Sequence, residues 1–332
     1  AATAGQVSNF EVLRVDNTGG ATNMAVFGAN PGFTTFTASA AASTITNATS
    51  TLAQIELDGG ADTSVTMSRL VDGTADTIDI ETTATEAITT ISIVDEETVT
   101  IDAADGALTI TTFTTTDMTS LTVTGDNAVN VGTSSGTAVA TVDASAMTAA
   151  FTGVFSASIV AMTATAPATI GSSITTGSGA DTVTGSTGDD TITTNNGADN
   201  ITAGTGDDTI DAGGSHDTIN SGNGANGVTG GAGGDTMTGG TGVETYVQTT
   251  TSSVAPSAIS MAGATIAIGD SVTFANGVDL ITNFGTTTDD IVNLGSTGLP
   301  TTLIGKTVTD VGGTDSYFGS GAWDATAKTF TF

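Results

Sequence analysis

Apolar residues alternate with threonine or serine in short segments through the first half of the chain. The first segment is FEVLRV at Phe10–Val15, and alternation with a high content of threonine and valine is typical of β-strands. Seven more segments show the pattern: TIDI at 77–80, ISIV at 91–94, VTI at 99–101, LTI at 108–110, LTV at 121–123, VNV at 129–131 and ATV at 140–142. Since helix-forming patterns are almost missing up to Gly171, we predict an all-β fold.

The spacing of these segments leaves two architectures open. Strands recur about every 8 to 13 residues with Asp, Asn and Gly between them, which fits a β-solenoid with uneven coils or a two-sheet sandwich. The apolar residues are small and scattered, and they are too few for the thick core of a sandwich. We therefore favour a right-handed parallel β-solenoid.

The pattern changes at Thr176, where a nine-residue repeat begins and runs without a gap to Val247. Its eight units are TGSGADTVT, GSTGDDTIT, TNNGADNIT, AGTGDDTID, AGGSHDTIN, SGNGANGVT, GGAGGDTMT and GGTGVETYV. The fourth position is glycine except at Ser215, the sixth is aspartate except at Asn226 and Glu244, and the eighth is always apolar. A repeat with a fixed phase indicates one small structural unit that is stacked many times.

Each unit predicts a tight bend followed by a very short strand. Six residues rich in Gly, Asp, Asn and Ser supply the bend, and the last three place one apolar side chain between two polar ones. Two units then close one coil, so that alternate bends stack in an odd row and an even row. Strands stack at about 4.8 Å. The odd row becomes a ladder of carboxylates at nearly that spacing, formed by Asp181, Asp199, Asp217 and Asp235.

Such a ladder repels itself. At an effective dielectric constant of about 20, two unit charges about 4.8 Å apart cost roughly 3.5 kcal/mol, whereas burial of one Val or Ile contributes about 1.5–3 kcal/mol. We therefore expect that the stack does not form alone and that a hard cation joins successive bends. Ca²⁺ fits, because carboxylates and bend carbonyls supply the roughly six to eight oxygens it prefers, whereas Mg²⁺ requires a small rigid octahedron.

The predicted ligands of several Ca²⁺ ions are the sixth-position carboxylates and the glycine-rich bends. The carboxylates are Asp181, Asp190, Asp199, Asp208, Asp217, Asp235 and Glu244. The glycines are Gly177, Gly179, Gly188, Gly197, Gly204, Gly206, Gly213, Gly222, Gly224, Gly231, Gly233, Gly240 and Gly242. Because Ser215 and Asn226 depart from the pattern, we expect the poorest site in the middle of the even row.

The units resemble the GGxGxDxUx nonapeptide of RTX proteins, which forms a Ca²⁺-binding parallel β-roll. The resemblance implies a roll over residues 171–248 and export by type I secretion, the route of that family. A low-complexity linker rich in Gly, Thr and Asp is the alternative, and the fixed phase of the repeat speaks against it.

Composition and charge narrow the choice of partners. The chain has 332 residues, with 35 acidic and 4 basic side chains, a net charge of −31 and no cysteine. This charge argues against nucleic acid and anionic membrane surfaces, because nothing neutralises their phosphates, and it makes divalent cations the natural counterions. No apolar run approaches the roughly 20 residues of a membrane span, so we expect no direct membrane insertion.

Outside the nonapeptides, the succession of FEVLRV, LTVTGDNAVNV at 121–131 and ATVDASAM at 140–147 resembles the lattice region of Caulobacter-type bacterial surface-layer proteins, themselves RTX proteins. In that family, solenoid coils and Ca²⁺-binding rolls tile into a sheet over the outer membrane. The resemblance implies a secreted protein of the cell surface of a Gram-negative bacterium that assembles with copies of itself. The family's helical anchoring domain has no counterpart here, so we expect a missing or separate anchor to contact cell-surface polysaccharide.

Beyond Val247 the nine-residue period is lost. The segment DLITNFGTTTDDIVNL at 279–294 resembles the sequence that follows the last nonapeptides of RTX proteins, where larger apolar residues cover the open end of the roll. A repeat array needs such a cap because its last coil otherwise exposes apolar surface and unpaired backbone. We therefore predict a solenoid over 1–170, the roll over 171–248 and a C-terminal β capping and assembly segment over 249–332.

Enzymatic chemistry finds little support in the sequence. The HExxH motif of zinc proteases is absent, and the single histidine is His216 in the bend of unit five. Residues Gly132–Gly136 match GxSxG formally, but no helix pattern follows to build a nucleophile elbow. We expect that the protein is not an enzyme.

Acidic residues outside the roll either bind further Ca²⁺ where coils meet or end their strands in solvent, and we favour the second interpretation. They are Asp95, Glu96, Glu97, Asp102 and Asp105, with Asp289 and Asp290 nearer the C-terminus.

Two functions agree with these observations. The first is a structural surface-layer protein whose Ca²⁺-dependent folding and self-assembly form a two-dimensional lattice. The second is the distal Ca²⁺-binding portion of a secreted RTX adhesin, in which the roll is a folding device and another surface holds a partner. The composition and a solenoid that runs straight into the roll favour the first.

Overall fold

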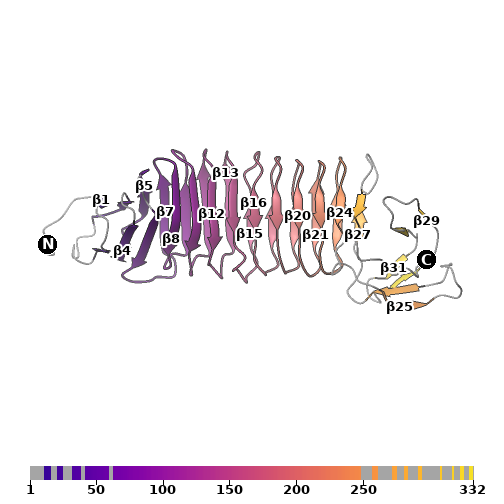
Figure 1. The fold of residues 1–332 in the computed structure, drawn as a ribbon. Helices are drawn as coiled ribbons and strands as arrows, with labels where there is room; N and C mark the ends of the chain where they lie inside the picture. Colours follow the sequence, from indigo (N-terminus) through magenta and orange to yellow (C-terminus); the bar gives the residue numbers. More distant parts are fainter. Residues whose placement is uncertain are drawn as a thin grey trace.

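The protein is an elongated stack of β-strands in the computed structural model (Figure 1). The described residues are 11–15, 21–24, 32–38, 42–59 and 63–247, together with the short strands β25 to β32 bounded below. Two parallel sheets of 13 strands each run along the stack. The predicted all-β solenoid is thus confirmed. The described residues contain no helix with the length and apolarity that a membrane crossing requires.

The first sheet, which we call the odd sheet, contains the odd-numbered strands of the stack. They are β1 (Val12–Val15), β3 (Thr35–Ala38), β5 (Gln54–Leu57), β7 (Thr77–Thr82), β9 (Thr98–Asp102), β11 (Ser120–Gly125), β13 (Thr141–Met147), β15 (Thr163–Thr165), β17 (Thr182–Thr184), β19 (Asn200–Thr202), β21 (Thr218–Gly222), β23 (Thr236–Gly239) and β27 (Leu280–Thr282).

The second sheet, the even sheet, contains the even-numbered strands of the stack. They are β2 (Thr22–Asn23), β4 (Ala42–Ala48), β6 (Ser64–Arg69), β8 (Glu86–Ile93), β10 (Leu108–Thr114), β12 (Val129–Ser134), β14 (Phe151–Val154), β16 (Ser173–Thr175), β18 (Thr191–Thr193), β20 (Thr209–Asp211), β22 (Gly227–Thr229), β24 (Thr245–Val247) and β28 (Ile291–Asn293).

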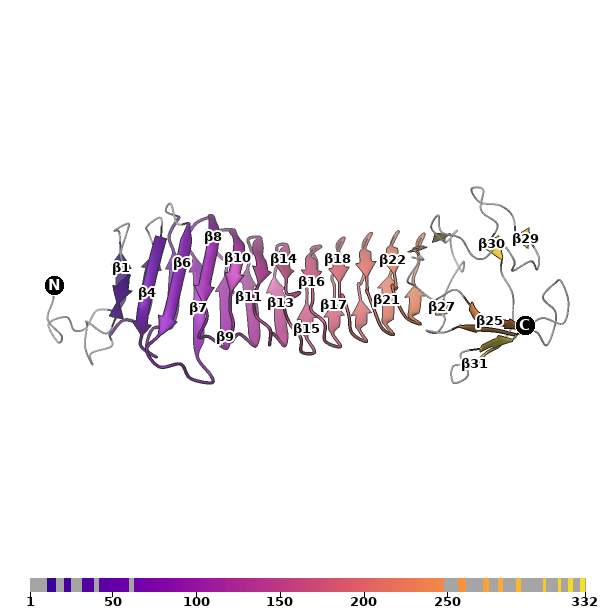
Figure 2. The same ribbon diagram turned by 60° about the horizontal axis from the view of Figure 1, so that its bottom comes forward.

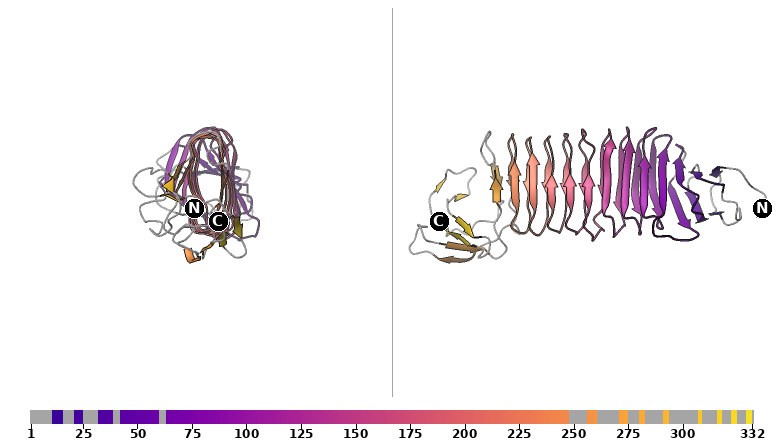
Figure 3. Two further views of the ribbon diagram at one scale, coloured as in Figure 1. Left: turned by 90° about the vertical axis from the view of Figure 1, so that its right-hand side faces the viewer. Right: turned by 180° about the vertical axis from the view of Figure 1, so that it is seen from behind.

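Consecutive strands alternate between the two sheets, so two strands and two connections make one coil. Viewed along the stack, the coils superimpose as a flattened ring (Figure 3). Each strand pairs in parallel with the strands of the coils before and after it, as where Ile201 faces Val183 on one side and Ile219 on the other. This parallel pairing between coils decides in favour of the solenoid and against the sandwich.

The core lies between the two sheets and is built from alternate residues of each strand. In β7 the buried side chains include Ile78 and Ile80, and in β9 they are Val99 and Ile101, while their neighbours point outward. Large buried residues such as Phe113 help to fill the core in the first half of the stack. The predicted segments from 77 to 142 all coincide with or overlap strands β7 to β13.

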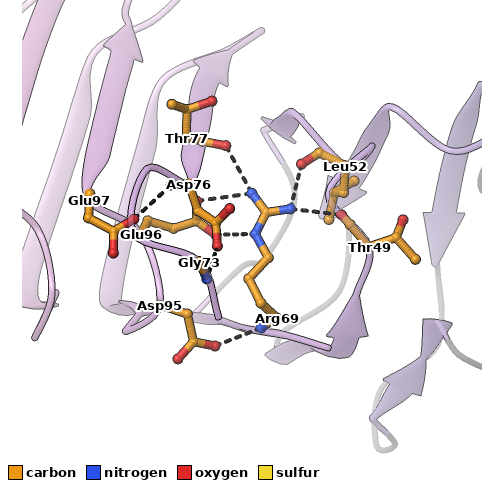
Figure 4. Close-up of polar contacts among 9 residues, drawn as sticks. All are labelled: Thr49, Leu52, Arg69, Gly73, Asp76, Thr77, Asp95, Glu96 and Glu97. Carbon is orange, nitrogen blue, oxygen red and sulfur yellow. Dashed lines mark hydrogen bonds and ion pairs between the residues drawn. The ribbon is translucent and has the colours of Figure 1, made fainter. Parts of the chain in front are cut away.

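A charged side chain interrupts this apolar core near its N-terminal end. Arg69, at the end of β6, is buried and forms an ion pair with buried Glu96, with Nε to Oε1 at 2.5 Å (Figure 4). Its guanidinium also donates to the carbonyl oxygens of Thr49, Leu52 and Thr77 at 2.8–2.9 Å. Both sequence interpretations of Glu96 are therefore wrong, because this carboxylate neutralises an inward-facing arginine and is neither a solvated strand end nor a Ca²⁺ ligand.

The sheets continue without a break past residue 171 and past the last nonapeptide (Figure 2). At the far end of the stack, β27 pairs in parallel with β23, and β28 pairs with β24. Both strands belong to the predicted capping segment. The remaining strands are antiparallel and form a four-stranded sheet and a two-stranded sheet. They are β25 (Pro256–Ser260), β26 (Ser271–Phe274), β31 (Ala322–Asp324) and β32 (Thr329–Thr331), and the pair β29 (Thr307–Val308) and β30 (Ser316–Tyr317).

Candidate metal centre

Each nonapeptide forms one bend and the strand that follows it. The bends of units one, three, five and seven lead into the odd sheet, and those of the other four units lead into the even sheet. Equivalent bends stack directly, as parallel bridges from Asn196 to Gly214 and from Thr205 to Asn223 show. The odd row and the even row of bends are therefore present as predicted, on opposite edges of the flattened coil.

The sixth-position side chains of both rows point into the coil. Asp181, Asp190, Asp199 and Asp208 are all no more than 2% exposed. They share this inward face with the apolar residue two positions later, such as Ile210, because positions six and eight have the same parity. The carboxylates thus line the interior at the two edges of the roll instead of pointing into solvent.

Hydrogen bonds join these carboxylates into ladders that run along the stack. In the odd row, Oδ1 of Asp199 accepts the backbone N–H of Asp181 at 2.7 Å, and Oδ1 of Asp217 accepts that of Asp199 at 2.9 Å. In the even row, Oδ1 of Asp208 accepts the N–H of Asp190 at 2.8 Å. One oxygen of each carboxylate therefore fixes the preceding coil to its own.

In several units the second carboxylate oxygen accepts no hydrogen bond. Oδ2 of Asp208 is buried and has no hydrogen-bond partner, and the same holds for Oδ2 of Asp199. The Thr194 hydroxyl near Asp199 does not satisfy it, because that hydroxyl donates to the carbonyl oxygen of Ala212 at 3.0 Å. A buried ionised oxygen without a donor is costly, so these positions need a proton or a cation.

Burial also changes the acidity of these groups. It raises the pKa of Asp181, Asp190, Asp199 and Asp208 above the ordinary value, because a low-polarity surrounding disfavours the charged form. For Asp208 the pKa rises to about 6. The hydrogen bond from the Asp190 N–H opposes this rise, and the negative charge of the Asp190 side chain adds to it.

The glycines of the bends allow the coils to approach closely. Gly224 has a φ of +135°, and a Cβ atom placed on it would lie 1.8 Å from the carbonyl oxygen of Gly206 in the preceding coil. Ser215 adopts a φ of +106° at the same position of unit five, where the pattern calls for glycine. The predicted glycines lie in the bends or at the adjoining strand end, with Gly177, Gly179, Gly197, Gly213, Gly231 and Gly233 in the odd row and Gly188, Gly204, Gly206, Gly222, Gly224, Gly240 and Gly242 in the even row.

The even row is more varied than the odd row in its sixth-position residues and in the donors that reach them. In unit two, Ser186 donates its N–H at 2.7 Å and its hydroxyl at 2.8 Å to Oδ2 of Asp190. The even row then continues through Asp208 and Asn226 to Glu244, which is buried and accepts the Gly240 N–H at 3.1 Å. The odd row carries aspartate throughout. It holds Asp181, Asp199, Asp217 and Asp235.

The arrangement fits a hard divalent cation. Buried carboxylate oxygens without donors, densely packed bend carbonyls and the lack of basic side chains in the repeat form an all-oxygen donor set, the type that Ca²⁺ prefers. The sixth-position carboxylates and the carbonyls of the bends would hold the ion. Bound Ca²⁺ would supply the positive charge that the ladders lack.

Three acidic residues outside the roll were missed as a group by sequence reasoning. Asp72, Asp95 and Asp117 come from the connections β6–β7, β8–β9 and β10–β11, and their ligand atoms lie within 4.8 Å of one another. They lie on the edge that continues into the odd row. Only Asp95 was singled out from the sequence, because the three residues are far apart in the chain and come together only when the coils stack.

Among the described residues, the other acidic residues singled out from the sequence do not join a cluster of this kind. Glu97 accepts the Asp76 N–H at 2.7 Å, and Asp102 accepts the Ala104 N–H at 3.1 Å. Asp105 is exposed. Asp289 and Asp290 lie outside the described residues.

The residues weighed for catalysis are not brought together. Ser134, in the formal GxSxG match, is buried at the end of β12, and its hydroxyl pairs with that of Thr115 at 3.0 Å. His216 lies several coils further along in the odd row, where its Nδ1 contacts the backbone of Gly234.

The fold and the site define a parallel β-solenoid whose second half is a carboxylate-lined β-roll. In a comparison with protein families, residues 175–210 and 193–228 match the model of the RTX calcium-binding nonapeptide repeat (4 copies). The segment is therefore an RTX roll and its cofactor is Ca²⁺. RTX repeats occur in secreted proteins, which supports an extracellular location. No curated protein and no solved structure matched the chain.

Proposed function

We propose that this is a structural surface-layer protein, in which Ca²⁺ folds the roll and copies of the chain assemble into a two-dimensional lattice on the bacterial cell surface. The observation that carries the proposal is the unbroken stack of solenoid and roll in two continuous sheets. Such a rod presents outward-facing positions at the same spacing in every coil. Periodic lateral faces of this kind support ordered association between copies.

The outward faces support side-by-side contact. In the roll, strands such as β17 (TVT) and β18 (TIT) present threonine outward and one aliphatic residue inward. The solenoid edge that continues into the odd row also exposes Leu70, Val71 and Ile159. Small polar faces with a few apolar projections suit contacts between copies. The net charge of −31 opposes such contacts until divalent cations reduce it.

Negative-stain electron microscopy of the purified chain tests the proposal. Samples in Ca²⁺, in Mg²⁺ at the same millimolar concentration and in chelator separate specific binding from charge screening. We expect ordered sheets or regular oligomers in Ca²⁺ alone. A folded protein that stays monomeric in Ca²⁺ at all accessible concentrations contradicts lattice assembly and favours the distal portion of an RTX adhesin. Attachment through a separate polysaccharide-binding anchor belongs to the same proposal.

A further inference from the structure

Asn226 stands where the even row would otherwise place an aspartate. Its Oδ1 accepts the backbone N–H of Asp208 at 2.9 Å, as Oδ1 of Asp208 accepts that of Asp190 one coil earlier. This bond fixes the orientation of the amide, because a second N–H group cannot face the N–H of Asp208. The amide nitrogen of Asn226 therefore occupies the position of the second carboxylate oxygen in an aspartate unit.

At that position the nitrogen faces oxygen atoms only. Nδ2 of Asn226 donates to the carbonyl oxygens of Ser221 and Gly222 at 3.3 and 3.4 Å and reaches Oε1 of Glu244 at 3.5 Å. The Asn226 side chain is 1% exposed. A buried group with two N–H donors is thus surrounded by acceptors of its own unit and of the next coil.

The neighbouring unit shows the opposite situation. Asp208 is equally buried, and its Oδ2 has no hydrogen-bond partner. Unit two needs no cation for its second oxygen because Ser186 donates to Asp190, but the buried Oδ2 of Asp208 lacks a donor, so unit four needs a cation or a proton. A unit with asparagine does not, because its amide donates.

We propose that the amide of Asn226 replaces a Ca²⁺ ion in unit six, so that this bend closes without metal and divides the even row of cation sites. The odd row, which carries aspartate in every unit, then holds the continuous series of sites. The inference concerns the distribution of Ca²⁺ within the roll and does not depend on lattice assembly. It also gives the predicted weak site in the middle of the even row a structural cause.

The variant Asn226→Asp tests this directly, since it exchanges the amide for a carboxylate of the same shape. We expect about one additional Ca²⁺ per full-length chain in equilibrium dialysis or calorimetry, together with a higher Ca²⁺ concentration at the folding midpoint followed by circular dichroism. The matched control is Asn200→Asp, which makes the same change on an exposed outward position of β19 and should leave the Ca²⁺ count unchanged.

The reciprocal variant Asp208→Asn should bind about one Ca²⁺ fewer than the wild type and should retain more strand signal in chelator. Unchanged Ca²⁺ counts in both variants overturn the proposal. So does an Asn226→Asp protein that fails to fold at saturating Ca²⁺, because an aspartate in that bend would then not act as its neighbour does. These readouts count ions and strand content, so they are independent of whether sheets form in the microscope.

Discussion

The bends of the roll impose a strict size limit on single residues. Gly224 and Gly227 lie three positions apart in unit six, yet they differ in the space around them. A Cβ atom on Gly224 would meet the carbonyl oxygen of Gly206 at 1.8 Å and would sit on a backbone with positive φ. A Cβ atom on Gly227 would meet nothing within 4 Å. The repeat therefore strongly favours glycine at the fourth position, where Ser215 is the exception, and tolerates side chains at the seventh.

This contrast predicts opposite outcomes for two alanine variants of one unit. Gly224→Ala should lower the free energy of unfolding by about 3 kcal/mol or more, because it adds backbone strain and a steric clash. Gly227→Ala should leave it unchanged or raise it by about 0.5 kcal/mol, because alanine restricts the unfolded chain. Denaturation at saturating Ca²⁺, followed by circular dichroism, measures both. Similar losses in the two variants would contradict the close approach of coils.

The ladders of buried carboxylates are the feature that matters at the scale of the element. Their hydrogen bonds link each coil to the next, but their charge and burial oppose the folded state. The pKa of Asp208 in the fold is about 6, above the value of about 3.9 for an unfolded chain. A proton can therefore substitute for the missing cation when the pH is low enough.

The metal-free roll is accordingly expected to be more stable in acid than at neutral pH. Below about pH 3.9 the carboxyl group of Asp208 is protonated in both states and its contribution is fully present, whereas the contribution is lost as the pH rises through about 6. The loss from this residue is on the order of 3 kcal/mol. Urea denaturation of metal-stripped protein at pH 4.5 and pH 7.5 measures most of this loss, about 2 kcal/mol. Asp208→Asn should show a smaller difference between the two pH values, and equal stability of the wild type at both would refute the expectation.

Sequence periodicity predicted the roll in detail, because its signal is local. The nine-residue phase specified the bends, the pairing of alternate units and the residues that form the two rows. The inward orientation of Asp181 and its equivalents was missed, although positions six and eight share a parity that points to it. The fold buries the carboxylate beside the apolar column.

The solenoid was predicted less completely, because its decisive contacts lie between coils. Strands β4 (ASTITNA) and β6 (SVTMSR) were overlooked, since they contain few large apolar residues. Arg69 at the end of β6 looks like a solvent-facing residue when read alone. Its partner Glu96 lies 27 residues away, and no local pattern connects the two.

At the scale of the whole molecule, one stack contains two regions that are stabilised differently. The solenoid buries large side chains such as Phe113 and Phe151, together with aliphatic residues from every strand. The roll buries one apolar residue per short strand and several carboxylates, so its stability depends on the ion. The sheets are continuous, but the source of their stability changes near residue 176.

Hydrogen–deuterium exchange should reveal this change. In chelator at neutral pH we expect residues 176–247 to exchange rapidly and residues 98–154 to stay protected, because only the former need Ca²⁺ to offset buried charge. Addition of Ca²⁺ should restore protection in the roll. Peptide-resolved mass spectrometry gives the comparison, with the protein in equimolar Mg²⁺ as the control. Full protection of the roll in chelator would show that its ladders are stable without metal.

The burial of Arg69 has a practical consequence for limited proteolysis. Trypsin cuts after lysine and arginine, and the sequence offers it no site between Arg69 and Lys306. The guanidinium of Arg69 is enclosed by Glu96 and three carbonyl oxygens. A tryptic cut there reports that the coils around β6 have opened. Trypsin resistance of the long fragment beyond it says nothing about the roll, whose unfolding has to be followed with a protease of different specificity.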